Sequence, residues 1–115
     1  MTQEMFVDWL QGALTNISSE WNERGNGFAA TTKDNRLVLS HHDGKHTLRA
    51  EIIVTPIPER SSAYLMGVPS VDHNSADSVR SEQPWDELTA ESLYVIIDST
   101  WARAEERRKS HPMYR

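Results

Sequence analysis

The sequence contains no cysteine, which excludes disulfide bonds, zinc–thiolate sites and thiol catalysis. Its longest apolar run, Leu93 to Ile97, is far too short to cross a bilayer. The opening residues, Met-Thr-Gln-Glu, supply neither the basic nor the apolar region of a signal peptide. A glycine-rich phosphate loop and a Gly-x-Ser-x-Gly nucleophile motif are also missing. We therefore expect a cytoplasmic protein that is not an enzyme, needs no cofactor and does not enter a membrane.

What is present is a polar but foldable chain of 115 residues, of which 37% are hydrophobic and 25% charged. This length allows one modest core, so residues 1–115 are expected to form a single domain. The net charge of −5 is unevenly placed, because residues 72–98 are acidic apart from Arg80 and residues 103–115 are mainly basic. Acids at the start and bases at the end of a helix suit its dipole. The alternative interpretation is a basic tail that binds an acidic partner.

Two amphipathic helices are predicted, one near each end of the chain. The first covers residues 3–24, where apolar side chains recur at three- and four-residue steps. Gly12 weakens this helix by about 1 kcal/mol relative to alanine, unless it allows a neighbouring element to approach closely. The second covers about 90–109 and begins after Thr89, a favourable N-cap. Its β-favouring Tyr-Val-Ile-Ile run makes a strand the alternative there.

A β-hairpin is predicted around Asp43-Gly44, because this dipeptide between two alternating apolar and polar segments is typical of a type I′ turn. A two-residue turn at this point would place Leu39 opposite Leu48 and Arg36 opposite Glu51. Both pairings are favourable, which supports this register.

The hairpin extends into a three-stranded antiparallel meander, with Asp34-Asn35 as its first turn. The strands are expected at 27–33, 36–42 and 45–54. Two prolines end the third strand. Residues 62–68 add a possible short fourth strand at an edge, and the polar segment 69–84 is expected to be a mobile loop. The fold class is therefore α+β, with both helices on one face of the sheet.

Alternation along these strands separates a buried face from one that carries charge. Bases outnumber acids on the second face, and two apolar side chains lie among them. An acidic protein, a nucleic acid backbone or the acidic segment 72–98 of the chain itself could cover such a face, which could equally be ordinary solvated sheet. Trp85 stands in a polar stretch, where it either folds back onto the domain or anchors a partner. The candidate partner-binding residues are Lys33, Arg36, Val38, Lys45, Arg49, Ile53 and Trp85.

Histidines gather at the tip of the predicted hairpin. The two-residue turn would make His41 and His46 cross-strand neighbours, with Cβ atoms about 5 Å apart. Two imidazoles at that distance could share a metal ion or sense pH. Asp43, or a loop residue such as Asp72 or His73, could complete the ligand set. Nothing in the sequence fixes where that loop lies, so a solvated strand end is the main interpretation and no metal is expected.

The order helix, three antiparallel strands, helix is similar to that of double-stranded RNA-binding domains and of acidic bacterial secretion chaperones. Where the RNA-binding domains have a cluster of lysines, at the start of the last helix, this chain has Asp86, Glu87 and Glu91. The similarity is one of topology alone and transfers no functional residue.

The main functional hypothesis is a small non-enzymatic protein-interaction module that binds and modulates a partner protein, as accessory, immunity or phage-type inhibitor proteins do. The alternative is a nucleic-acid-binding domain that uses the basic sheet face and the C-terminal Arg/Lys residues. A homodimer is a further open alternative.

Overall fold

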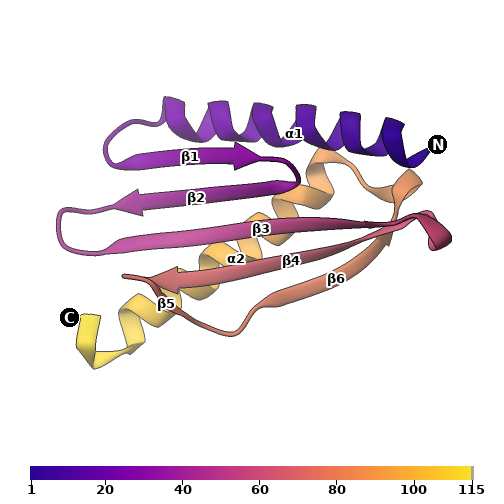
Figure 1. Cartoon of the computed structure of the whole chain (residues 1–115). Coiled ribbons are helices and arrows are strands. Elements are labelled where there is room, and N and C mark those ends of the chain that lie inside the picture. The colour runs from indigo at the N-terminus through magenta and orange to yellow at the C-terminus, as the bar shows by residue number, and fades with distance from the viewer. Residues whose placement is uncertain (115) are drawn as a thin grey trace.

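The computed structural model describes residues 1–114 and has the expected α+β class: an N-terminal helix, an antiparallel sheet and a C-terminal helix (Figure 1). Helix α1 (Gln3–Glu23) begins after Thr2, whose side chain accepts a hydrogen bond from the backbone N–H of Met5 at 3.2 Å. It ends where Gly25 adopts a φ of +60°, a conformation that glycine reaches without steric cost.

In the described part of the chain, the sheet is larger than predicted and has six strands. They are β1 (Phe28–Lys33), β2 (Arg36–His42), β3 (Thr47–Ile57), β4 (Ser62–Val71), β5 (Asn74–Ser75) and β6 (Val79–Pro84). All pairings are antiparallel, in the order β1-β2-β3-β4, and both β5 and β6 pair with the far edge of β4. Figure 1 shows the first four strands as a regular meander.

The additional strands lie where a loop was expected. Segment 69–84 contains the end of β4 and all of β5 and β6. The third strand also runs further than predicted, through Pro56, because at that point β3 pairs with β4 alone. A residue without an N–H is tolerated at such a one-sided position. Between these two strands lies the short helix η1 (Pro58–Arg60).

The predicted register of the β2–β3 hairpin is wrong by two residues. Leu39 lies opposite Ala50, not Leu48, because the connection has four residues instead of two. The cause is the side chain of Asp43, which accepts hydrogen bonds from the backbone N–H groups of Lys45 at 3.0 Å and of His46 at 2.8 Å. A shift of two residues keeps every side chain on its predicted face. The two leucines are accordingly both buried.

A two-residue turn with both central φ angles positive does occur, but between β4 and β5. It consists of Asp72 (φ 49°) and His73 (φ 70°). The carboxylate of Asp72 accepts hydrogen bonds from the backbone N–H of Thr47 and from the ring of His46. These contacts across the loops stabilise a backbone conformation that non-glycine residues rarely adopt.

The C-terminal helix matches its prediction closely. Helix α2 (Ala90–Ser110) is capped by Thr89, which forms a reciprocal capping box with Ser92. The short helices η2 (Trp85–Glu87) and η3 (Pro112–Tyr114) lie before and after it. Among residues 1–114, no helix combines the length and the apolar character needed to span a membrane.

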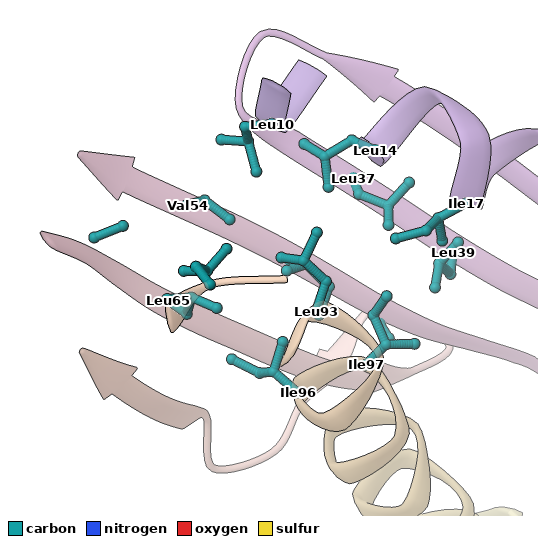
Figure 2. Close-up of a cluster of buried hydrophobic side chains, with 14 of the residues drawn as sticks. Leu10, Leu14, Ile17, Leu37, Leu39, Val54, Leu65, Leu93, Ile96 and Ile97 are labelled. Atoms are coloured by element: carbon teal, nitrogen blue, oxygen red, sulfur yellow. The ribbon is translucent and has the colours of Figure 1, made fainter. Parts of the chain in front are cut away.

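Side chains from both helices enter one hydrophobic cluster with the inward-facing residues of β2, β3 and β4 (Figure 2). Helix α2 lies very close to the sheet at Gly67 of β4. A Cβ atom at this position would lie 1.9 Å from the hydroxyl oxygen of Thr100, so only glycine fits there without movement. Within residues 1–114, no helix covers the opposite face of the sheet (Figure 1).

Candidate functional site

The face of the sheet turned away from the helices, here called the outer face, is the best candidate for a functional surface. The strand register assigns to it Thr31 and Lys33 (β1), Arg36, Val38 and Ser40 (β2), Arg49, Glu51 and Ile53 (β3), Tyr64, Met66 and Val68 (β4), and Arg80 and Glu82 (β6). It therefore extends over every long strand of the sheet.

One row of directly paired residues crosses the whole outer face. From β1 to β6 the row reads Lys33, Arg36, Ile53, Met66 and Arg80, so two apolar side chains lie between cations. The neighbouring row adds Val38 and Val68 on either side of Glu51. These four apolar side chains are all half-buried. The outer face thus has an apolar centre and a charged border.

The border is most cationic beside the turn between β1 and β2. Lys33 and Arg36 pair directly, and like charges placed opposite each other destabilise a sheet. Arg36 also forms an ion pair with Glu51, with Nε and Oε1 3.1 Å apart. A hollow of about 340 Å³ opens here, lined by Lys33, Asp34, Asn35, Arg36 and Ile53. The side-chain oxygen of Asn35 is buried and makes no hydrogen bond there.

Five of the seven candidate residues lie together on the outer face, and Lys45 does not. It belongs to the four-residue connection after β2, where its backbone N–H bonds to Asp43. Its predicted place on a strand depended on a two-residue turn between β2 and β3, where the structure has four residues instead.

Trp85 is not an exposed anchor. Only 5% of its surface is accessible, and its indole stacks on the ring of Phe6 with centroids 5.2 Å apart and planes at 13°. The backbone N–H of Trp85 donates to the carbonyl of Ser61 at 2.9 Å. Helix η2 therefore turns this residue into the core beside the start of α1. Because Trp85 has polar neighbours in the sequence, composition alone did not indicate that it is buried.

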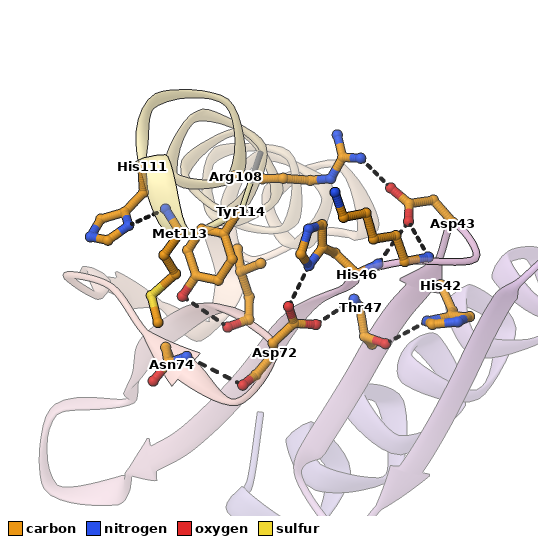
Figure 3. Close-up of polar contacts among 12 residues, drawn as sticks. His42, Asp43, His46, Thr47, Asp72, Asn74, Arg108, His111, Met113 and Tyr114 are labelled. Atoms are coloured by element: carbon orange, nitrogen blue, oxygen red, sulfur yellow. Dashed lines mark hydrogen bonds and ion pairs between the residues drawn. The ribbon is translucent and has the colours of Figure 1, made fainter.

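His41 and His46 are not cross-strand neighbours, because the longer loop places His46 outside the ladder. His41 pairs with Leu48 and stacks on Phe28, with ring centroids 4.1 Å apart. The Nδ1 atom of His46 lies 2.5 Å from a carboxylate oxygen of Asp72. Figure 3 marks this contact with a dashed line. Within residues 1–114, no three His, Asp or Glu side chains are grouped as metal ligands would be.

The polar cluster in Figure 3 connects two loops to the C-terminal helix. Asp43 forms an ion pair with Arg108 of α2. Hydrogen bonds from the backbone N–H groups of His46 and Lys45 lower the pKa of Asp43 to about 2. The backbone N–H of Thr47, followed by the ring of His46, likewise lowers the pKa of Asp72.

The side chain of His46 is buried within the same cluster. Its Nε2 atom is buried without a hydrogen-bond partner, and the ring packs against the edge of Tyr114. A buried imidazole cannot exchange protons with a substrate on the surface. The contact between His46 and Asp72 joins two loops, and this structural role fits the arrangement better than catalysis.

The C-terminal bases do not extend the outer face. Helix α2 packs on the opposite side of the sheet, and Arg108 is engaged with Asp43. Arg115 lies outside the described residues. The acidic segment 72–98 does not cover the outer face either, since its strand β6 joins the edge of β4 and its remainder leads into α2. The structure thus removes two possibilities: that the C-terminal bases enlarge the outer face, and that the acidic segment covers it.

Sequence reasoning missed half of the apolar centre. Met66 and Val68 lie on a strand that was only weakly indicated, and Arg80 lies on a strand that was not predicted. Burial along β4 alternates from Ala63 to Pro69, but apolar residues stand on both faces there, so the sequence has no clear apolar and polar alternation. Comparison of the chain with family models, curated proteins and solved structures gives no significant match.

Proposed function

We propose that this protein is a non-enzymatic interaction module, which binds an acidic surface of a partner protein through the outer face and thereby modulates that partner. The observation that carries the proposal is the row from Lys33 to Arg80, with an apolar centre between cations. An apolar centre within a charged border is the usual composition of a protein-binding surface.

The charges favour an acidic partner. Lys33 and Arg36 repel each other beside a hollow, and a carboxylate entering that hollow would relieve the repulsion. A second copy of the chain, related by a twofold axis, would bring cations against cations on this face. We propose the cytosol as the compartment. A chain without cysteine forms no disulfide bonds, so an oxidising compartment would not stabilise it.

Nucleic acid binding is the competing interpretation, and the distribution of apolar residues makes it weaker. Phosphate contacts need cations along the path of a backbone. Here Ile53 and Met66 occupy the middle of the face and separate the cations at its two ends. The basic end of α2 lies on the other side of the sheet.

The test is an NMR titration of the intact protein with two defined probes, an amphipathic peptide of glutamate and leucine and a 20-base-pair DNA duplex. We expect the peptide to shift the amide signals of β2, β3 and β4, and the variant Ile53→Asp to abolish the effect. The control is Lys109→Glu, which reverses a charge at an exposed position of α2. This variant should bind like the wild type.

Two results would overturn the proposal. One is tighter binding of the duplex than of the peptide, with an affinity that falls steeply as salt is raised, which identifies phosphate recognition. The other is equal peptide binding by Ile53→Asp and by the wild type, which removes the outer face from consideration.

A further inference from the structure

A second hollow lies on the helical side of the molecule, between α1 and the first turns of α2. Its volume is about 480 Å³. In Figure 1 α1 runs along the strands while α2 crosses the sheet diagonally, so the two helices diverge. The residues that line this groove are Asp8, Trp9, Gly12, Ala13, Asn16, Ile17 and Glu20 of α1, with Ala90 and Tyr94 of α2.

Nothing in the fold of the free protein requires a glycine at position 12. It occupies the interior of a 21-residue helix, where glycine is unfavourable. Its φ is not positive, so no special backbone conformation requires it. A Cβ atom built at Gly12 meets nothing within 4 Å, so no neighbouring element makes the close approach that glycine permits. The missing side chain leaves the groove deeper at this point.

The floor of the groove is apolar and its border is acidic. Trp9, Ala13 and Tyr94 are partly exposed there while packing against the core. Asp8 and Glu20 are the charged residues of the lining, which includes no lysine or arginine. They are twelve positions apart on α1, or about 18 Å along its axis.

Glu20 is held in place by Tyr94, whose hydroxyl donates to its carboxylate. This hydrogen bond, together with partial burial, raises the pKa of Tyr94 to about 12. Asp98 adds negative charge near the same hydroxyl, and the nearby cation Arg24 is stacked 4.2 Å from the Trp21 ring. The carboxylate of Glu20 is therefore held in place at one end of the groove.

We infer that this groove binds a cationic amphipathic helix of another protein, which crosses α1 at Gly12. Apolar side chains of that helix would contact Trp9 and Tyr94, and its lysines or arginines would reach Asp8 and Glu20. Amphipathic helices bind apolar grooves in this way, through anchors on successive turns. The inference does not rest on the proposed function of the outer face, because the two surfaces are on opposite sides of the sheet.

The decisive variant is Gly12→Ala, because its effects on stability and on binding have opposite signs. Alanine meets no atom of the free protein and favours the helix, so the midpoint of thermal unfolding should rise by about 4 °C. The same methyl group would hold a bound helix away from α1. We expect the dissociation constant for an 18-residue helical peptide of leucine, alanine and lysine to increase at least tenfold, measured by calorimetry.

The matched control is Thr15→Ala, an exposed position of α1 outside the groove lining. It should raise the unfolding midpoint in the same direction and leave the affinity for the peptide unchanged. Glu20→Gln should weaken binding and reduce its dependence on salt. A peptide with glutamate in place of lysine should not bind to the wild type.

Three outcomes would overturn the inference. The first is equal affinity of Gly12→Ala and Thr15→Ala for the lysine peptide. The second is a set of NMR shifts confined to the outer face. The third is concentration-dependent self-association that Gly12→Ala abolishes, since a second copy would then be the occupant. Ile53→Asp should leave this binding intact, which separates a failure here from a failure of the proposed function.

Discussion

Asn22 of α1 is hydrogen-bonded to both backbone groups of Ala30 on β1. Its side-chain nitrogen donates to the Ala30 carbonyl at 3.1 Å, and its side-chain oxygen accepts from the Ala30 N–H at 2.8 Å. Strand β1 has β2 as its partner on one side, so these two groups point to its outer edge. The amide of Asn22 thus takes the place of an additional strand, which is one way in which proteins protect an exposed edge.

Asn22→Ala should therefore promote association through β1. We expect a loss of about 1 kcal/mol in the free energy of unfolding, measured by urea titration, because two hydrogen bonds disappear. Light scattering should also increase at high protein concentration. Asn16→Ala, the same substitution at an exposed position of the same helix, is the control and should cause neither effect. Equal behaviour of the two variants would show that Asn22 does not protect the edge.

Gly67→Ala should destabilise the protein by about 1–3 kcal/mol, because its methyl group would overlap the hydroxyl of Thr100. Thr100→Ala alone loses a hydrogen bond to the carbonyl of Ile96, and we expect a smaller effect. The double variant should be more stable than Gly67→Ala, as a thermodynamic cycle from urea unfolding would measure.

The control for this cycle is Gly12→Ala, which introduces the same methyl group where nothing lies within 4 Å. That variant should be stabilised. Additive effects of Gly67→Ala and Thr100→Ala would contradict the close contact between β4 and α2.

Low pH should destabilise the protein, because it protonates the Asp43 carboxylate that stabilises one of the loops. The pKa of Asp43 is lowered in the folded state, from 3.8 to about 2. The stability it provides is complete above the unfolded value and is lost as the pH falls through the folded one. Asp43→Asn keeps an oxygen that accepts from Lys45 and His46 but does not titrate. Between pH 4 and pH 2 the unfolding free energy of this variant should fall less steeply than that of the wild type.

Urea unfolding at a series of pH values measures this difference. Asp77→Asn, at a position outside the cluster of Figure 3, provides the comparison for a simple loss of one negative charge. Parallel curves for the wild type and Asp43→Asn would disprove the role of Asp43.

The absence of cysteine allows the hairpin register to be tested directly. Ser40→Cys with Arg49→Cys places two thiols on directly opposed residues, at a separation that suits a disulfide bond. Ser40→Cys with Thr47→Cys would be opposed only in a hairpin with a two-residue turn. Mild oxidation followed by mass spectrometry should give an intramolecular disulfide rapidly in the first variant. Faster oxidation of the second variant would instead show that the hairpin has the two-residue turn.

The helices and the inner face of the sheet were predictable because they depend on periodicity. Helix α2 was expected at 90–109 and observed at Ala90–Ser110, since its cap and its apolar spacing are local signals. The hairpin register was not predictable from the Asp-Gly pair. A side chain of Asp43 that bonds forward to two N–H groups competes with the tight turn, and Arg108, distant in sequence, then binds the same carboxylate.

The outer face was predictable only in part. Its residues on β2 and β3 follow from alternation, which survives a register error of two. Those on β6 do not, because Val79, Ser81 and Gln83 face inward with little apolar character. Trp85 illustrates the same limit, since a tertiary contact with Phe6 decides its burial and its polar neighbours do not.

The alternation along β2, β3 and β4 also has an evolutionary consequence. Inward side chains such as Leu39 and Ile52 fill the core, whereas Val38 and Ile53, each one position away, take no part in it. Substitutions at the latter positions can accumulate over generations while the fold persists. A lineage of such proteins can thus acquire new specificities on an unchanged scaffold, by varying one set of alternate residues.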